Sequence, residues 1–376
     1  MNTPREVIIV GAGPAGVGIA ALLRRSSVQD ILIVDSHEVG ASFLRWPEET
    51  RFITPSFFSN PFGQVDLNAV TPDSSLALFS GEEHSTGKTY AHYLFTVLDE
   101  YQIPVLAPAR IVNVALLSSG NFILTTATGE ILETQALVWA TGEFQFPNRQ
   151  VFTGADFCCH YADVSRWKDI QPGEHIVIGG YESAIDAAVN LLENGSSVKM
   201  LTRSAPWSAN HSNDPSISLS PYTRERLNRM MNNRLFDIVE DADVCEVTRI
   251  TGSTDAYQIH TTDGRAWHTE EIPILATGFQ SGGGARQLSS FFEWNEGGYP
   301  ILTEEDSSTL FQGLFMVGPQ VRQADNIYCF IYKFRQRFPV VAESIARHLQ
   351  LPFTSPINWW SPSVEPGCLD NSNCDC

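Results

Sequence analysis

The sequence predicts an α/β protein of two interleaved domains, each combining a parallel sheet with an antiparallel meander. An apolar strand, a glycine-rich turn and a helical run occur near the N-terminus and recur near residue 175. Each copy also has a late partner strand that ends in Ala-Thr-Gly. Repeated strand–helix–strand units build parallel, doubly wound sheets, so the repeat indicates two Rossmann-like domains.

The first copy opens the chain. Residues 6–10 form an apolar run that suits a fully buried strand, and a run with helical character follows at 17–25. A second apolar strand, 31–34, ends on Asp35. Strand, turn, helix and strand therefore occur in the order that a βαβ unit requires.

The second copy repeats this order. Its strand at 175–178 leads through a glycine-rich turn into a helical run that ends near Leu192, and a strand follows at 198–201. The late partner strands deliver the closures Ala140-Thr141-Gly142 and Ala276-Thr277-Gly278. Both closures are turns of small residues at the end of an apolar strand.

The order of these elements predicts the domain boundaries. Alternating apolar and polar residues at 121–126 and 257–262 predict antiparallel meander strands. After the second closure come an apolar strand at 314–317 and a helical stretch from about Asp325 to Leu349. The simplest topology has a first domain at 1–145, an inserted second domain at 146–284, a return to the first at 285–350 and a cysteine-containing tail at 351–376.

Composition restricts the partners. The 376 residues carry 24 Lys and Arg against 43 Asp and Glu, which gives a net charge of −19. Such a field repels phosphate backbones and anionic lipid, so neither nucleic acid nor a membrane surface is an expected partner. We find neither a secretory signal nor an apolar stretch of membrane-spanning length, and we expect a cytoplasmic protein.

The seven cysteines are odd in number and scattered. They form neither a disulfide ladder nor the CxxC pairs of zinc sites, so no metal site is predicted. Cys158 and Cys159 precede His160, a neighbour that would lower the pKa of a thiol. This vicinal pair is therefore a candidate for redox chemistry, although adjacent cysteines form only a strained ring.

The turn Gly11-Ala-Gly13-Pro14-Ala15-Gly16 determines the chemistry of the first copy. Gly11 permits a tight reversal, Gly13 lets the backbone approach a diphosphate, and Gly16 lets helix and strand pack closely. The N-terminus of the next helix offers free N–H groups and the positive end of its dipole. Asp35, nineteen residues beyond Gly16, is placed to bind ribose hydroxyls. Together these features predict a dinucleotide site.

The second turn, Gly179-Gly180-Tyr181-Glu182-Ser183-Ala184, departs from this pattern because Tyr181 replaces the middle glycine. The tyrosine either crowds the diphosphate or lies aside while the backbone still donates. No acidic residue follows the second strand, where Thr202, Arg203 and Ser204 stand instead. Arg203 suits a 2′-phosphate, which favours NADPH over NADH. A degenerate turn that binds nothing is the alternative.

The paired turns and closures resemble those of the two-dinucleotide-binding-domain flavoproteins, which include flavin-containing monooxygenases, thioredoxin reductases and bacillithiol disulfide reductases. The resemblance covers about residues 5–350. It implies FAD on the first domain, NADPH on the second and hydride transfer between them, with a helix near Asp325 pointing its positive end at the flavin. It assigns to FAD the residues Ala140, Thr141, Gly142, Gly318 and Asp325, and to NADPH the residues Ala276, Thr277 and Gly278.

No single branch matches closely. The internal CxxC of thioredoxin reductases is missing, and Ala15 stands where bacillithiol disulfide reductases carry their reactive cysteine. The monooxygenase motif F-x-G-x-x-x-H starts correctly at Phe152, but His160 comes two residues late. Pro319 replaces an aspartate that relatives place on the ribityl chain.

Candidate catalytic residues are few. The resemblance places Trp46 and Asn60 along the flavin, although a packed loop explains their segment equally well. The tail thiols could shuttle electrons, bind a soft metal or have no role. Trp359 and Trp360 are expected to anchor this tail. The three tail thiols belong to Cys368, Cys374 and Cys376.

We interpret the chain as an FAD-dependent, NADPH-using oxidoreductase. The leading hypothesis is monooxygenase-like chemistry, in which reduced FAD activates O2 to oxygenate a small, soft nucleophile. Thiol–disulfide oxidoreduction through the tail cysteines is the second hypothesis. A non-enzymatic redox-sensing module that binds both nucleotides is the third. The expected partner is a small-molecule substrate or a disulfide, and a homodimer is left open.

Overall fold

A computed structural model describes residues 3–58, 65–207, 216–250, 256–354 and Trp359. The chain divides into two compact units. The first comprises Met1–Leu44, Pro55–Gln145 and Ser281–Cys376, and the second comprises Arg45–Thr54 and Phe146–Gln280. Residues 45–54 thus belong to the second unit, whereas the sequence analysis placed them in the first domain. The second unit also ends at Gln280 rather than at residue 284.

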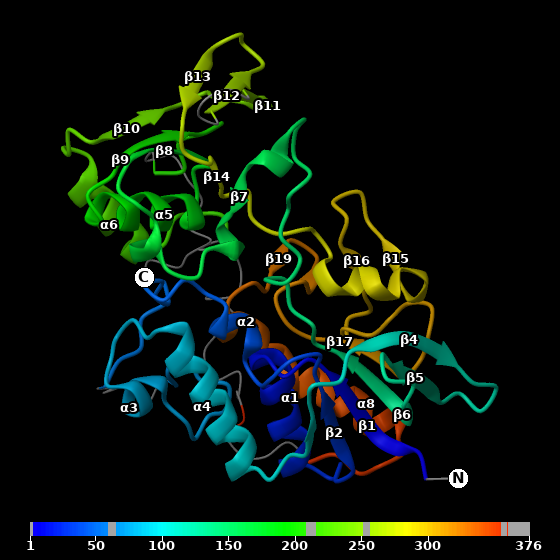
Figure 1. Ribbon diagram of the computed structural model, residues 1–376. Coiled ribbons are helices and arrows are strands. Elements are labelled where there is room, and N and C mark those ends of the chain that lie inside the picture. The colour runs from blue at the N-terminus through cyan, green and yellow to red at the C-terminus, as the bar shows by residue number, and fades with distance from the viewer. Residues whose placement is uncertain (1–2, 59–64, 208–215, 251–255, 355–358, 360–376) are drawn as a thin grey trace. The chain divides into compact units, whose positions relative to one another are not determined.

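The first unit is built on a seven-stranded sheet of order β3-β2-β1-β6-β5-β4, with β17 paired to the end of β6 (Figure 1). Up to the insertion its elements are β1 (Arg5–Val10), α1 (Pro14–Arg25), β2 (Ile31–Val34), α2 (Ala41–Leu44), α3 (Leu76–Ser80), α4 (Gly87–Glu100), β3 (Val105–Leu106), β4 (Ile111–Leu116), β5 (Phe122–Thr126) and β6 (Ile131–Trp139). The return adds the 3₁₀ helix η4 (Gly283–Phe291), β15 (Glu293–Trp294), β16 (Pro300–Ile301), β17 (Leu314–Met316), β18 (Arg322–Gln323), β19 (Asn326–Ile327), α7 (Ile331–Phe334), η5 (Arg335–Arg337) and α8 (Phe338–His348).

Burial explains why these strands are so apolar. The whole of β2 and the last four residues of β1 are buried, as in parallel strands that are covered on both faces. β1, β2, β6 and β17 run parallel, whereas β4, β5 and β6 form an antiparallel meander. Helix α1 begins at Pro14, whose missing N–H is harmless in a first turn, and it contacts both α4 and α8. Within the described ranges, none of the helices combines the length and apolar character needed to cross a membrane.

The second unit contains a five-stranded parallel sheet of order β10-β9-β8-β14-β7 and a separate antiparallel sheet, β11-β12-β13. Its elements are η1 (Ala155–Phe157), β7 (Cys159–His160), η2 (Tyr161–Asp163), η3 (Trp167–Asp169), β8 (Glu174–Ile178), α5 (Glu182–Glu193), β9 (Ser197–Leu201), α6 (Pro221–Met230), β10 (Phe236–Val239), β11 (Val244–Ile250), β12 (Ala256–Thr261), β13 (Ala266–Thr269) and β14 (Ile274–Leu275).

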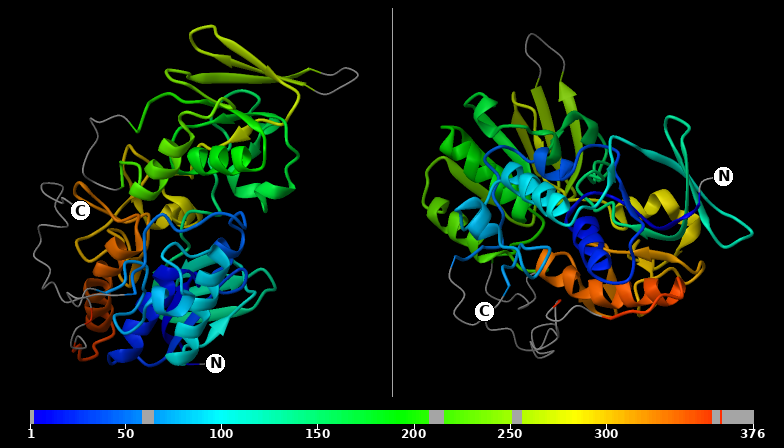
Figure 2. Two further views of the ribbon diagram at one scale, coloured as in Figure 1. Left: turned by 90° about the vertical axis from the view of Figure 1, so that its left-hand side faces the viewer. Right: turned by 90° about the horizontal axis from the view of Figure 1, so that it is seen from below.

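Helix α5 and the meander cover opposite faces of this parallel sheet (Figure 2). Val177 of β8 packs in one core with Trp167 and the apolar face of α5. Its neighbours Ile176 and Ile178 pack in the other core with Ile259 of β12. Successive strand residues point to opposite faces, so one short strand supplies both cores. The predicted fold class, two α/β domains with parallel sheets and meanders, is confirmed.

One predicted helix start is wrong. The helix expected from Asp325 begins only at Ile331, because residues 322–327 form the β18–β19 hairpin. Ala324, in the turn of this hairpin, has a φ of 49°, which a right-handed helix cannot contain. Asp325 therefore lies in a tight turn, and no helix N-terminus is available there to face a flavin.

A buried hydrogen-bond network around Asp186 attaches residues 45–54 to the second unit. Thr50 Oγ1 and the Tyr161 hydroxyl each donate to Asp186 Oδ2 over 2.7 Å. Arg226 Nη1 donates to Oδ1 over 2.6 Å. The side chains of Asp186 and Arg226 are only 9% and 14% exposed. A single buried carboxylate of α5 therefore holds a segment that arrives from the first domain.

We expect Asp186→Ala to lower the free energy of unfolding by about 3–5 kcal/mol, because it leaves the Arg226 guanidinium buried without its counter-charge. Urea denaturation measures this loss. Asp163→Ala is the matched control, since it removes a carboxylate paired with Arg149 at an exposed position. The control should change stability by less than about 1 kcal/mol, and equal losses in the two variants would contradict the assigned role of the network.

Candidate cofactor sites

The two glycine-rich turns lie at the carboxyl ends of β1 and β8, the edge at which parallel α/β sheets bind ligands. In both turns the first glycine touches the closure. A Cβ on Gly11 would lie 2.3 Å from the Ala140 carbonyl oxygen, and one on Gly179 would lie 2.3 Å from that of Ala276. Both glycines have a φ in the left-handed range, 117° and 138°. The sequence duplication is therefore also a duplication of backbone packing.

Gly13 and Gly16 have different surroundings. A Cβ on Gly16 would lie 1.9 Å from the Gly11 carbonyl oxygen, so this glycine permits the close packing of α1 on β1. A Cβ on Gly13 would meet nothing within 4 Å. Gly13 is the N-cap of α1, and as a glycine it has no side chain with which to cap the N–H groups of this helix. Open space before an uncapped helix N-terminus fits a diphosphate, so the first turn fits FAD.

Asp35 lies directly beside the first turn. Its Oδ2 accepts a hydrogen bond from Ala12 N over 2.7 Å, and Oδ1 accepts one from His37 N over 2.8 Å. The carboxylate at the end of β2 thus fixes the turn that precedes α1. Its contact with a ribose stays a prediction.

The second turn uses its side chains differently. Tyr181 is the N-cap of α5 and is 37% exposed. Glu182 accepts hydrogen bonds from Ser220 N, over 2.6 Å, and from the Thr223 hydroxyl, both at the start of α6. Burial raises the pKa of the Glu182 carboxyl. This carboxyl therefore joins α5 to α6 and is not available to a nucleotide.

The end of β9 packs against this turn. A Cβ on Gly180 would lie 1.9 Å from Thr202 Oγ1, which itself donates to the Ser204 carbonyl oxygen over 2.6 Å. The Arg203 side chain is 82% exposed, and its Nε lies 4.0 Å from an Asp243 carboxylate oxygen. An exposed guanidinium group beside this turn is suited to the 2′-phosphate that distinguishes NADPH from NADH.

The vicinal cysteines do not have the low pKa values that the sequence suggested. Burial, together with the neighbouring thiol of Cys159, raises the pKa of Cys158 to about 12, and burial raises that of Cys159 as well. His160 Nδ1 accepts from Ala162 N over 3.1 Å, and Nε2 lies 3.2 Å from the Gly278 carbonyl oxygen. Burial lowers the pKa of His160, so the ring is neutral and does not stabilise a thiolate.

The remaining candidates are not brought together. Trp46 packs against Phe52, with 5.0 Å between ring centroids, in the segment that belongs to the second unit. Trp359 is buried and packs edge-on against Tyr101, with 6.2 Å between centroids, as expected for an anchor. Four candidates lie outside the described residues: Asn60, Cys368, Cys374 and Cys376.

A polar pair near the first turn was not predicted from the sequence. A Cβ on Gly318 would lie 3.1 Å from the Ala15 Cβ, so the turn after β17 adjoins the first turn. Two residues further on, Gln320 Nε2 donates to Glu143 Oε2 over 2.7 Å. Glu143 directly follows the turn that ends at Gly142, and Gln320 comes two residues after Gly318. A polar residue just after a small-residue turn is the sequence signal that could have identified both.

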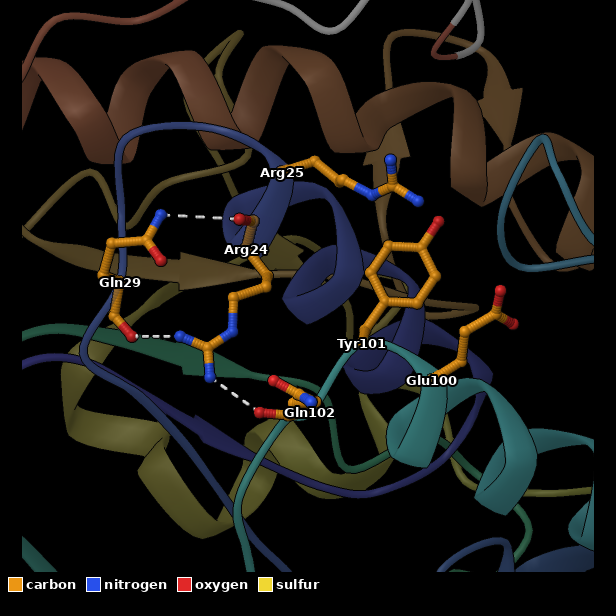
Figure 3. A pocket seen from close by; sticks show the side chains of 6 residues that line it. All are labelled: Arg24, Arg25, Gln29, Glu100, Tyr101 and Gln102. Carbon is orange, nitrogen blue, oxygen red and sulfur yellow. Dashed lines mark hydrogen bonds between the residues drawn. The ribbon is translucent and has the colours of Figure 1, made fainter.

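A pocket lies near the C-terminal end of α1, at the opposite end of this helix from the first turn (Figure 3). Arg24 donates to the carbonyl oxygens of Gln29 and Gln102 over 2.7 and 2.6 Å. Arg25 pairs with Asp73 and lies 4.9 Å above the Tyr101 ring. Both guanidinium groups are therefore engaged within the protein, far along α1 from its N-terminus.

The chain belongs to the pyridine nucleotide-disulphide oxidoreductase family, which it matches over residues 8–318. It is 28% identical over 193 residues to the uncharacterized oxidoreductase CzcO of Bacillus velezensis, covering 50% of this chain and 51% of the relative. The chain thus spans about half the length of the first curated relatives it matches. FAD and NADPH, the cofactors predicted from the sequence, are confirmed at the level of the family.

Solved structures share the fold. The bacillithiol disulfide reductase of Staphylococcus aureus has a TM-score of 0.72 at 24% identity, covering 92% of this chain and 99% of the other. A flavin-containing monooxygenase of Stenotrophomonas maltophilia has a TM-score of 0.71 at 15% identity, covering 93% and 100%. At these identities the likeness concerns the fold alone, and both kinds of oxidoreductase share it.

Two glycine variants separate binding from packing in the first turn. Gly13→Ala places a methyl group where the diphosphate should lie, and we expect it to weaken FAD binding by about 1–3 kcal/mol without destabilising the fold. Gly16→Ala drives its methyl group into the Gly11 carbonyl, and we expect it to destabilise the protein. Flavin absorbance per chain and urea denaturation measure the two effects. Full flavin content in Gly13→Ala would contradict the assignment.

Arg203→Ala tests the coenzyme preference. We expect NADPH binding to weaken by about 1.5 kcal/mol, the lower end of the range for charged hydrogen bonds, because Arg203 is exposed. NADH binding should hardly change, since it lacks the 2′-phosphate. Lys199→Ala is the matched control because Lys199 pairs with Asp237. Stopped-flow titration of flavin reduction gives both dissociation constants, and equal losses for the two coenzymes would contradict the role.

Proposed function

We propose that this chain is an FAD-dependent NADPH oxidoreductase with monooxygenase-like chemistry toward a small, soft nucleophile. The second turn holds NADPH as the hydride donor, and Arg203 selects its 2′-phosphate. The first turn holds FAD, which supplies hydride acceptance and electron delivery to oxygen when bound. Gly13 and the uncapped N-terminus of α1 orient its diphosphate.

The state of the vicinal thiols of Cys158 and Cys159 supports this choice over disulfide exchange. Exchange requires a thiolate, and burial keeps the thiols of Cys158 and Cys159 protonated at neutral pH. In the first turn, Ala15 offers no thiol and is buried. Neither of these two buried thiols is therefore suited to relay electrons, and the first turn itself carries no thiol.

A second candidate function, thiol–disulfide oxidoreduction, is favoured by the position of Trp359. Its contact with Tyr101, beside Arg25 at the end of α1, anchors the chain nine residues before Cys368. Nine extended residues reach about 30 Å, whereas the twelve residues of α1 span about 18 Å. The segment between Trp359 and Cys368 is therefore long enough for a tail thiol to reach the first turn.

Truncation after Pro366 distinguishes the two functions, because it removes the three tail cysteines and keeps every residue that the structure describes. We expect NADPH-dependent incorporation of ¹⁸O from O2 into an amine or thioether substrate to survive almost unchanged. Mass spectrometry of the product measures it, which separates oxygenation from simple NADPH oxidation.

The control is a full-length variant with serine at positions 368, 374 and 376, which keeps the tail but not its thiols. If both variants lose NADPH-dependent reduction of a disulfide, and no substrate acquires ¹⁸O, the tail relay is the function. If the intact protein turns over neither kind of substrate while still binding both nucleotides, the redox-sensing alternative replaces both.

A further inference from the structure

The strand order of the first unit determines the order of the groups at the carboxyl ends of its parallel strands (Figure 1). In sheet order, β2 ends at Asp35, β1 at the glycine turn, β6 at the Ala140-Thr141-Gly142 closure and β17 at Gly318. The turn after β17 adjoins the glycine turn, since a Cβ on Gly318 would lie 3.1 Å from the Ala15 Cβ. A dinucleotide with one ribose at Asp35 and its diphosphate on that turn extends its other half past β6 and β17.

Two polar side chains stand at the ends of β6 and β17 and hold each other. Gln320 Nε2 donates to Glu143 Oε2 over 2.7 Å, while Gln320 Oε1 accepts from Gly282 N over 2.8 Å. Gln320 is only 5% exposed, and Glu143 is half-buried. These hydrogen bonds fix which way the amide points, with its oxygen toward Gly282 and its nitrogen toward the carboxyl group.

The pair keeps one donor and one acceptor for a ligand. Within the described part of the chain, Glu143 Oε1 and the second amide hydrogen of Gln320 make no hydrogen bond. The neighbouring Pro319 has no N–H and no polar side chain to offer. A hydroxyl group donates and accepts at once, so an adjacent donor and acceptor are complementary to a polyol.

We propose that Glu143 and Gln320 position FAD by hydrogen-bonding the hydroxyl groups of its ribityl chain. The backbone around Gly13 holds the diphosphate, and this pair fixes the chain that leads from the diphosphate to the flavin ring. Burial raises the pKa of Glu143, although the positive charge of Arg322 acts in the opposite direction. A carboxyl group that is poorly solvated in the free protein gains by meeting hydroxyl groups. Both residues are positioning residues.

A comparison of FAD with ADP tests the proposal, because ADP carries the diphosphate and adenosine but no ribityl chain. Dilution of the holoenzyme, followed by flavin fluorescence, gives the dissociation constant of FAD, and displacement of FAD by ADP gives that of ADP. We expect Glu143→Ala to weaken FAD on the order of 10- to 100-fold, the effect of losing one or two hydrogen bonds at a partly buried site. ADP should change by less than about threefold.

Glu133→Ala is the matched control, because Glu133 lies on β6, the strand that precedes Glu143, and carries the same charge. Its carboxylate bonds Asn121 near the start of that strand, so FAD binding should not change. If Glu143→Ala weakens FAD and ADP equally, the pair only joins two segments of the fold and the proposal fails. Unchanged FAD binding overturns it as well.

Glu143→Gln covers the case in which the alanine variant does not fold. The glutamine keeps an acceptor for the Gln320 amide and nearly the same shape, so FAD alone should weaken, by about 3- to 10-fold. An unaltered ratio of FAD to ADP affinity in this variant contradicts the proposal. The proposal rests on FAD lying on the first turn, which Gly13→Ala tests separately.

Discussion

The structure depends on one repeated contact between backbones, in which the first glycine of a turn touches the carbonyl group of a small-residue closure. The distance that a Cβ would have is the same in both units, 2.3 Å, for Gly11 over Ala140 and for Gly179 over Ala276. A side chain on either glycine would force the closure strand away from its neighbour. Because the contact brings turn and closure together at the carboxyl ends of adjacent strands, it also determines where each nucleotide can lie.

Local patterns were enough to predict the elements around this contact, and long-range contacts explain the failures. Apolar runs, glycine spacing and alternation identify the βαβ openings, the closures and the meanders, since each signal lies within a few residues. The assignment of Thr50 to the first domain failed because its anchor, Asp186, lies 136 residues away in sequence. The prediction that a helix starts at Asp325 was wrong because alanine, the residue type at position 324, does not indicate a left-handed backbone.

The same distinction applies to the sites. Glycine spacing located both turns, because the close approach of each turn to its closure requires that residue type. Thiol chemistry was not predictable in this way, since Cys158 and His160 are neighbours in sequence but burial sets both pKa values. The pair of Glu143 and Gln320 spans 177 residues and becomes visible only once β17 is placed beside β6. Motifs thus identify backbone requirements, while polar partnerships depend on the assembled sheet.

The two turns keep the same backbone contact but differ in what surrounds it, and the difference matches two ways of using a nucleotide. Around the first turn, Asp35 accepts a hydrogen bond from the loop and Gln320 is buried and hydrogen-bonded, so the protein itself fixes both side chains. Around the second, Tyr181 and Arg203 are exposed, and Glu182 serves α6 instead of the ligand. An exposed cation attracts a phosphate through a contact that water and salt weaken. Such a contact suits a coenzyme that must leave after each hydride transfer, whereas a braced, buried site suits a cofactor that stays.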